Sequence, residues 1–363
     1  MRNKQLSELL SQYKEVCIYG AGIVAYGAYK AVRELYHTCI ECFLVTSGEG
    51  QPDRIAGIPV MELTKAPNGF SNKLIIVATP EEYHNDIVQN LKENKYNRYF
   101  LLDSHEEYIL MSRYLKKVQN IRLIEDYQTN GKLDKPDETG IYMAVSHKDK
   151  PLKGEYEEAP WIKKIQAGAA LTEDRIVEIT DEGADSLSTR NSLYCELSAS
   201  YYIWKYSNYR ITGLFHYRRI LNVTEEQLHL MEAKKIDVIL PLPFVCYPDA
   251  SGQYGRYLMP EDIYVMHEVL QEFEIDKMPE IERILQSPYL YNYNMLIARR
   301  EVFYDYCSWM FPLLEKIVDR CEKEKREKLP RYAGRIGEVL TSLYFMLNKQ
   351  QWNIAHAEKI WRI

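Results

Sequence analysis

The chain has 363 residues, more than one hydrophobic core usually supports, so two domains are expected. Its 46% hydrophobic and 27% charged residues are ordinary for a globular protein in water. The net charge of -6 excludes general nucleic-acid binding, because that function needs a positive field to neutralise phosphates.

Several features of the sequence favour the cytoplasm. No apolar run approaches the roughly 20 residues needed to cross a bilayer, and residues 1–16 are polar, without the core of a signal peptide. Cys39 and Cys42 form a single C-x-x-C pair inside a predicted strand, which indicates buried thiols rather than a zinc site. Contact with the inner face of the plasma membrane, through the first helix or the basic residues 328–335, stays open beside the simpler interpretation of solvated surfaces.

Residues 1–115 alternate between short apolar runs and helical patterns. Strands are predicted at 15–20, 39–45, 73–79 and 98–102, with helices over about 22–35 and 81–94. Since strand and helix repeats of this length form parallel pairs with right-handed crossovers, a Rossmann-like domain is expected. The following segment, 116–138, is rich in Gly, Pro, Asp and Lys and predicts a linker.

A glycine-rich turn joins the first strand to the first helix. Gly20, Gly22 and Ala25 occupy the place of a dinucleotide fingerprint, where a phosphate approaches the helix N-terminus. The acidic residue that holds the ribose of NAD is missing at the end of the second strand, which reads Val45-Thr46. The turn therefore fits a nucleotide or nucleotide-sugar site and, equally, a structural or regulatory domain without hydride transfer.

Residues 139–363 predict a second α/β domain. Strands are expected at 141–147, 175–180, 211–217, 235–241 and 291–298, with a loop over 160–172. Helices are expected at 192–206, capped by Asn191, and from Glu261, Glu301 and Gly337, with a kink at Pro312. The charged run 321–328 indicates a solvated face.

Polar residues gather where these strands end, which is where ligands bind in α/β folds. The densest group is the run His216-Tyr217-Arg218-Arg219. Because arginine keeps its charge and its planar fork matches phosphate oxygens, this run predicts a site for a diphosphate. The alternative is an exposed strand end whose cations pair with nearby carboxylates.

Four runs of the second domain stand out, in this order: IQAGAALT, ITDEGADSLSTRNSLYCELSASYYIWK, TGLFHYRR and EVFYDYCSWMFPLLEKI. Together they resemble a family of bacterial capsular and exopolysaccharide glycosyltransferases. That family was long filed as a domain of unknown function and includes galactofuranosyltransferases. The resemblance covers roughly residues 139–350, and HYRR and the Asn-x-x-Tyr-Cys-Glu-Leu segment are its most specific parts. It implies a GT-A-like fold, a UDP-sugar donor carrying galactofuranose or another hexose, and a lipid-linked saccharide acceptor. Where the family has a Gly-Asp-Asn-like turn, this chain has residues 183–186, Gly-Ala-Asp-Ser, which weakens a polar role there. The family pattern does not require the N-terminal domain.

The donor site implied by this resemblance is cationic. GT-A enzymes commonly hold a divalent metal on an Asp-x-Asp motif, and here His216, Arg218 and Arg219 occupy the equivalent strand end, so we expect no required cofactor and tolerance of a chelator. A bound divalent metal stays open as an alternative. His147 and Gln166 are expected to contact the base, the ribose or the sugar hydroxyls. Asn191 has the same expected role, besides capping its helix.

Inverting transfer needs a carboxylate that takes the proton of the acceptor hydroxyl. Asp262 is the first choice because it follows a loop rich in Tyr and Gly, and Glu261, Glu338 and Asp185 are the other candidates. Both Asp262 and Glu338 lie near predicted helix starts, where acids also stabilise the helix dipole without any catalytic role.

Two other functions fit parts of the sequence. A nucleotide-sugar-modifying enzyme would use the first domain for NAD(P), against which the absent ribose acid argues. A non-catalytic scaffold would bind nucleotide-sugars without turnover.

Overall fold

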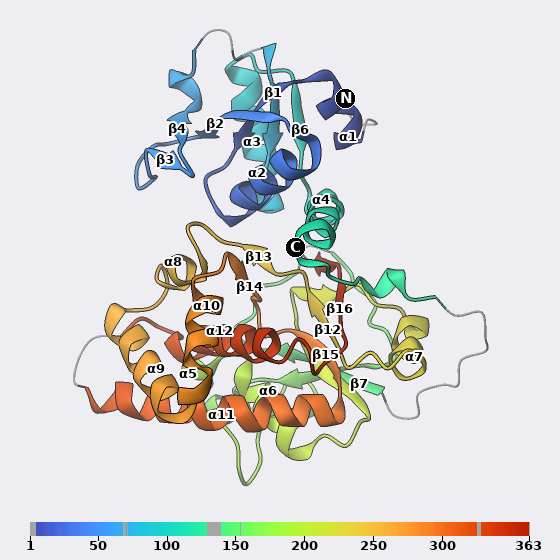
Figure 1. Ribbon diagram of the computed structural model, residues 1–363. Helices are drawn as coiled ribbons and strands as arrows, with labels where there is room; N and C mark the ends of the chain where they lie inside the picture. The colour runs from blue at the N-terminus through green and yellow to red at the C-terminus, as the bar shows by residue number, and fades with distance from the viewer. Residues whose placement is uncertain are drawn as a thin grey trace. The chain divides into compact units, whose positions relative to one another are not determined.

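The computed structural model describes residues 5–67, 70, 72–128, 139–152, 154–324 and 328–362. The contacts divide the chain into two compact units (Figure 1), namely Met1–Asn120 with Phe244–Pro248, and Ile121–Pro243 with Asp249–Ile363. Both units are α/β, as the sequence predicts. None of the described helices is long and apolar enough to cross a membrane.

The first unit contains a six-stranded sheet in the order β3-β4-β2-β1-β5-β6. Its strands are β1 (Glu15–Tyr19), β2 (Cys39–Val45), β3 (Arg54–Ile55), β4 (Ile58–Glu62), β5 (Leu74–Val77) and β6 (Tyr99–Leu101). The central β1 pairs in parallel with β2 and β5, which confirms the predicted Rossmann-like pairing. The edge hairpin of β3 and β4 is an addition that the sequence patterns do not predict.

Helices cover both faces of this sheet. They are α1 (Leu6–Gln12), α2 (Ile23–Tyr36), α3 (His84–Glu93) and α4 (Ser104–Gln119), with short 3-10 turns η1 (Leu63–Lys65) and η3 (Glu81–Tyr83). Ile87 and Leu91 of α3 pack with apolar residues from one face of β1, β2 and β5. Tyr29 of α2 packs on Phe43 from the other face, and α4 lies against α2.

Two expectations about this part of the chain differ from the structure. Cys42 is buried, but Cys39 at the start of β2 is exposed, so the prediction of two buried thiols is wrong for Cys39. The segment predicted as a linker, 116–138, begins in the last turn of α4 and includes the 3-10 turn η4 (Ile124–Asp126). Its remainder from 129 to 138 lies outside the described residues.

The second unit is built on a larger mixed sheet in the order β16-β12-β15-β10-β7-β8-β9. β7, β8, β9 and β10 are parallel to one another, whereas β15 is antiparallel to both β10 and β12. A side branch adds β11 to β10 and β17 to β11. The bounds are β7 (Thr139–Val145), β8 (Ile162–Gln166), β9 (Ile179–Thr180), β10 (Ile211–His216), β11 (Arg219–Leu221), β12 (Val238–Pro241), β15 (Leu296–Arg299), β16 (Ile354–Ala357) and β17 (Lys359–Trp361).

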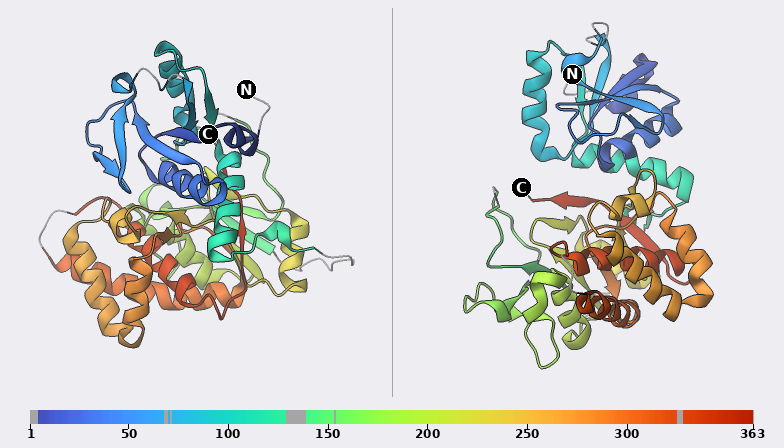
Figure 2. Two further views of the ribbon diagram at one scale, coloured as in Figure 1. Left: turned by 45° about the horizontal axis from the view of Figure 1, so that its top comes forward. Right: turned by 90° about the vertical axis from the view of Figure 1, so that its left-hand side faces the viewer.

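The remaining elements are mainly helical, and Figure 2 shows two further views of them. They are α5 (Asn191–Tyr194), α6 (Leu197–Tyr206), α7 (Glu225–Ala233), α8 (Ala250–Tyr254), α9 (Pro260–Phe273), α10 (Met278–Leu285), α11 (Arg300–Lys323), α12 (Tyr332–Leu347), η5 (Ala169–Leu171), η6 (Ser188–Arg190), η7 (Ile275–Lys277) and the short strand β14 (Tyr289–Leu290). The short strand β13 (Phe244–Val245) belongs to the first unit. α11 continues through Pro312 and contains the first residues of the charged run 321–328, of which 325–327 lie outside the described residues.

Three sequence predictions in this unit are wrong in detail. The expected loop over 160–172 contains strand β8, which pairs with β7 and β9. The expected helix 192–206 is two helices, because Cys195 between them has a φ of 55°. Asn191 is the first residue of α5 rather than its cap.

Both faces of the second sheet are buried by apolar side chains. Tyr142, Leu214 and Leu240 face a large core that includes α6, α9, α10, α11 and α12. Met143 and Phe215, from the alternate positions of the same strands, face a smaller core with α7. Because the sheet is covered on both sides, its strand ends are the exposed edges where polar groups can gather.

Candidate functional site

The parallel strands of the second unit bring several predicted residues to one edge of the sheet. In the register of these strands, His216 lies beside Ala144, and Val145 lies beside Gln166. His147 follows β7 two residues later, and β15 begins at this same edge because it runs antiparallel to β10. The predicted cationic run, His216 to Arg219, therefore lies at the same edge as the residues that precede β15.

Glu196 lies against His216 at this edge. Its Oε1 is 3.9 Å from the Nε2 of His216 and accepts a 2.8 Å hydrogen bond from the Nδ2 of Asn294. Asn294 is buried, and its own Oδ1 accepts from the hydroxyl of Thr341. Asn294 also has a φ of 50°, a left-handed conformation that asparagine tolerates better than most residues. The amide therefore fixes the position of the Glu196 carboxylate.

Glu338 supplies a second carboxylate to the same group. Its Oε1 accepts a 2.9 Å hydrogen bond from the backbone N–H of Tyr293. Burial raises the pKa of Glu338 to about 7, the negative charge of Glu196 adds to this rise, and Arg335 and Arg219 partly oppose it. A carboxylate with a pKa near 7 is suited to accept a proton at neutral pH.

Arg219 stacks between two aromatic rings. Its guanidinium carbon lies 4.4 Å from the ring centre of Tyr293 and 4.3 Å from that of Trp361. Its Nη1 lies 3.5 Å from the Nδ1 of His216, and its buried Nε has no hydrogen-bond partner among the described residues. Burial lowers the pKa of His216, the charge of Glu196 opposes this effect, and the charge of Arg219 adds to it.

Arg218 lies near a third acidic residue, Asp149, which follows β7. The Oδ2 of Asp149 accepts a 2.7 Å hydrogen bond from the backbone N–H of Ser146. Burial raises the pKa of Asp149 to about 6, while the positive charges of Arg218 and Arg331 oppose the rise. Neither Arg218 nor Arg219 forms an ion pair with a carboxylate among the described residues.

His147 lies beside this acidic residue. It lies close enough to Asp149 to interact electrostatically with that carboxyl. The Nδ1 of His147 is buried without a hydrogen-bond partner among the described residues.

The side chains of Gln166 and Asn191 form internal hydrogen bonds that stabilise neighbouring loops. Gln166 is buried, donates to the carbonyl of Asp174 and accepts from the N–H of Ile176. The Nδ2 of Asn191 donates to the carbonyl of Cys195 and to the hydroxyl of Ser198. Their expected contacts with a donor would compete with these internal hydrogen bonds.

The loop after β8 is organised by a buried carboxylate, Asp181. Its two oxygens accept hydrogen bonds from the N–H groups of Gly168 and Ala169 and from the hydroxyls of Ser188 and Ser198. Four donors satisfy a charged group that burial would otherwise make costly.

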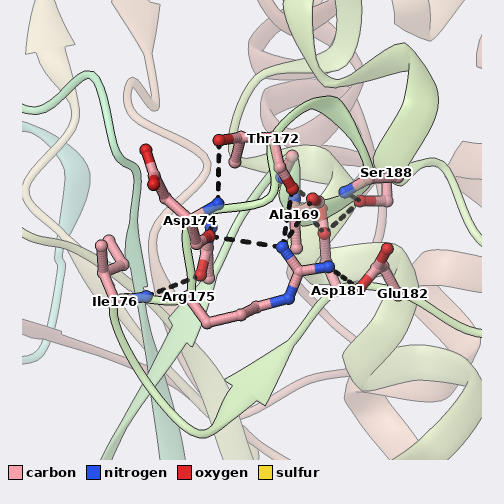
Figure 3. Close-up of polar contacts among 11 residues, drawn as sticks. Ala169, Thr172, Asp174, Arg175, Ile176, Asp181, Glu182 and Ser188 are labelled. Atoms are coloured by element: carbon pink, nitrogen blue, oxygen red, sulfur yellow. Dashed lines mark hydrogen bonds and ion pairs between the residues drawn. The ribbon is translucent and has the colours of Figure 1, made fainter.

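Arg175 closes the same loop from the outside, as Figure 3 shows. Its guanidinium donates to the carbonyls of Ala169 and Thr172 and pairs with Glu182. Together with Asp181, it holds residues 166–176 in one conformation next to the strand end.

The other two acidic candidates lie in different surroundings. Asp185 accepts from the hydroxyl of Tyr201 and pairs with Lys205, and these contacts lower its pKa. Asp262 is buried in the first turn of α9, where its charge reaches Tyr332. Among the described contacts, those of Glu338 connect it to the group around His216. Those of Asp185 and Asp262 do not.

The glycine-rich turn of the first unit has a packing explanation. Gly20 has a φ of 123°, and a Cβ there would lie 2.6 Å from the carbonyl oxygen of Ala78. Gly22 has open space around the position of a Cβ, and Ala25 is buried. The close approach of this turn to the end of β5 therefore requires glycine at position 20, with or without a bound ligand.

Sequence reasoning gave no role to four residues of this site. Glu196 and Asn294 stand in polar runs of the sequence, but only the fold brings them together over 98 positions. Tyr293 and Trp361 are aromatic residues among many, and no local pattern marks them as the walls around Arg219. Among the described residues, no group of three or more His, Cys, Asp or Glu side chains could hold a metal ion.

This architecture defines a class of protein. The mixed sheet, with one antiparallel strand among parallel ones and polar residues at the carboxyl ends, makes the second unit an α/β domain of GT-A-like type. The chain belongs to the family described as a domain of unknown function (DUF4422), whose model matches residues 141–350.

One solved structure is similar to this chain. It is described as the apo structure of the WbbM bifunctional glycosyltransferase, with 22% sequence identity and a TM-score of 0.53. The match covers 62% of this chain and 45% of that one, so this chain corresponds to less than half of that protein. At this identity the similarity supports the fold. A comparison with curated protein sequences finds no significant match.

Proposed function

We propose that this protein is a glycosyltransferase that moves a hexose from a UDP-sugar to a saccharide acceptor in capsular or exopolysaccharide synthesis. The observation that carries the proposal is the group at the carboxyl end of β10, where arginines without an ion pair to any described carboxylate lie near two acidic side chains, one with a pKa near 7. Family membership and the bifunctional glycosyltransferase of similar fold support the same reaction class.

The arginines would bind the donor diphosphate. Arg218 and Arg219 follow a parallel strand, stay charged at every working pH, and have no described carboxylate partner that would compete with phosphate oxygens. As the sugar departs, negative charge grows on the diphosphate, and fixed positive groups stabilise it. His216, placed by Arg219 and Glu196, would offer a hydrogen-bonding ring nitrogen at the same point. On this proposal no metal is required.

Glu338 is the proposed catalytic base. Its pKa near 7 allows it to take the proton of an acceptor hydroxyl at neutral pH, and Glu196 beside it favours proton uptake by like-charge repulsion. Asp185, whose pKa is lowered by Tyr201 and Lys205, is a weaker base. Asp262 would need an acceptor to reach a buried position under α9.

The finer identities come from the sequence resemblance alone. It favours galactofuranose or another hexose as the transferred sugar and a lipid-linked saccharide as the acceptor. Such an acceptor would place the enzyme in the cytoplasm at the inner face of the plasma membrane. His147, Gln166 and Asn191 are proposed to contact the base or ribose of the donor, Gln166 and Asn191 only if they exchange internal hydrogen bonds for ligand contacts.

A donor screen tests this function. The full chain is incubated with UDP-, GDP- and dTDP-sugars, with manganese or with a chelator, and the melting temperature is measured. We expect stabilisation by a UDP-sugar in both conditions, and its loss in Arg218→Ala. The matched control is Arg210→Ala, which removes an exposed arginine that pairs with Glu232 on another part of the unit.

Transfer is then measured by mass spectrometry with saccharide-lipid acceptors and the stabilising donor. Product formation with wild type and with Arg210→Ala supports the proposal. Donor binding without product for any acceptor would support a scaffold instead. Stabilisation by NAD(P) and by no sugar nucleotide would support a nucleotide-sugar-modifying enzyme.

A further inference from the structure

The first unit contains a cavity that the proposed transfer reaction does not use. It has a volume of about 740 Å³, within the range of small-ligand sites. Its wall comes from the ends of β1, β2 and β5 and from α3, which is where a Rossmann-like sheet usually binds its ligand. Gly20 lines it, whereas Gly22 and Ala25 are absent from its lining.

Hydrogen-bonding groups form the floor of this cavity. The hydroxyl of Tyr19, on a ring that is otherwise buried, accepts a 3.0 Å hydrogen bond from the Nδ2 of Asn90 and lies 2.7 Å from the hydroxyl of Thr46. The hydroxyl of Thr79, also in the lining, is buried without a partner among the described residues. The floor therefore offers both donors and acceptors at fixed positions.

The charge of the cavity argues against a nucleotide. Glu49, Asp86 and Glu93 line it, and no lysine, arginine or histidine does so among the described residues. A diphosphate would meet three carboxylates without a compensating cation, which disfavours its binding. The nucleotide site expected at Gly20, Gly22 and Ala25 stays a separate prediction, because Gly22 and Ala25 do not line this cavity.

The same groups suit a neutral sugar. Carboxylates and amides accept and donate hydrogen bonds to neighbouring hydroxyls, and the exposed ring of Tyr83, which lines the cavity, offers a flat apolar face for the C–H groups of a pyranose. We propose that this cavity binds an uncharged saccharide chain. That the bound chain is the acceptor or product of the enzyme is a further step, which rests on the proposed function.

The test uses neutral oligosaccharides of two to six glucose, galactose or mannose units. Binding to the full chain is followed by saturation-transfer NMR, with UDP and NAD as separate probes and spermidine as a cationic competitor. We expect saccharide signals that weaken at least about fivefold in Tyr83→Ala, the scale of about 1 kcal/mol for one stacking contact. Asp86→Ala, at an exposed position of α3, is expected to weaken them as well.

The matched control is Tyr264→Ala, which removes a tyrosine of α9 that is even more exposed than Tyr83. It should leave the saccharide signals unchanged, and UDP binding should be unaffected by Tyr83→Ala. The proposal is overturned if no neutral saccharide binds, if both Tyr83→Ala and Asp86→Ala leave the signals intact, or if NAD, UDP or spermidine displaces the saccharide. Because transfer activity is measured separately with purified donors, its absence would refute the proposed function and leave this binding result standing.

Discussion

Glu338 gives the most direct prediction about catalysis. If it accepts the proton of the acceptor hydroxyl, it must be ionised, and its folded-state pKa of about 7 sets the pH at which this happens. Activity should therefore rise as pH increases through 7. Glu338→Gln keeps the shape of the side chain and its hydrogen bond from Tyr293, but removes the base.

The size of the effect follows from the ionised fraction. With a pKa near 7, that fraction falls from about 0.9 at pH 8 to about 0.1 at pH 6, so kcat/KM should fall about tenfold. Loss of the base in Glu338→Gln should reduce kcat by roughly 10² to 10⁴ and abolish this limb of the pH profile.

The same carboxyl makes stability change with pH in the direction opposite to activity: activity rises with pH, whereas the stability from Glu338 falls. Its pKa is raised on folding, so the stability it contributes is present below the unfolded pKa and lost as pH rises through about 7. Glu338→Gln should therefore raise the free energy of unfolding at pH 8 by at most about 3 kcal/mol, and by less than about 1 kcal/mol at pH 5.

The assay measures initial rates from pH 5.5 to 9 with saturating and with limiting donor, and urea unfolding at pH 5 and 8. Glu226→Gln, at an exposed position in the first turn of α7, is the control and should match wild type in both. A Glu338→Gln enzyme that keeps its rate and its pH limb would refute the assignment of the base. A destabilised variant at pH 8 would refute the raised pKa.

Three further predictions concern other parts of the chain. Arg219→Lys keeps the charge but loses the planar stacking on Tyr293 and Trp361, and should raise the donor KM roughly fivefold, about 1 kcal/mol, in steady-state kinetics. Gly20→Ala forces a strained backbone and should lower the free energy of unfolding by roughly 2 kcal/mol in urea melts, whereas Gly22→Ala should have little effect. In Asp181→Asn the amide N–H₂ faces a backbone N–H that can only donate, so that hydrogen bond is lost, which should cost roughly 2–3 kcal/mol by the same measurement, while Asp185→Asn on the exposed loop should not.

The sequence predicts strands best where they are apolar and buried on both faces. β1, β2, β7 and β10 all meet that condition and were predicted within two residues of their observed bounds. β8 was missed because Lys163 and Lys164 interrupt its apolar pattern, and its conformation is decided by pairing with β7 and β9. The break at Cys195 was missed for a similar reason, since the apolar spacing of residues 193–204 continues across it.

The candidate site was predictable only in part. A strand followed by His, Tyr, Arg and Arg was enough to locate the cationic residues at one edge of the sheet. Glu338 is among the candidates from the sequence, but its pairing with Glu196 was not predictable, because Glu196 is held by Asn294 and Glu338 by the backbone of Tyr293, contacts that depend on the antiparallel course of β15. No property of Trp361 in the sequence indicates that its ring lies against Arg219.

The position of that tryptophan matters for dissecting the molecule. The matched family segment ends at residue 350, before β16 and β17, although β16 completes one margin of the sheet and Trp361 in β17 walls in Arg219. A fragment trimmed to the family limits would expose the backbone of β12 along its length and release one side of the arginine. Truncation studies should therefore follow the hydrogen-bonded strands rather than the span over which sequences can be aligned.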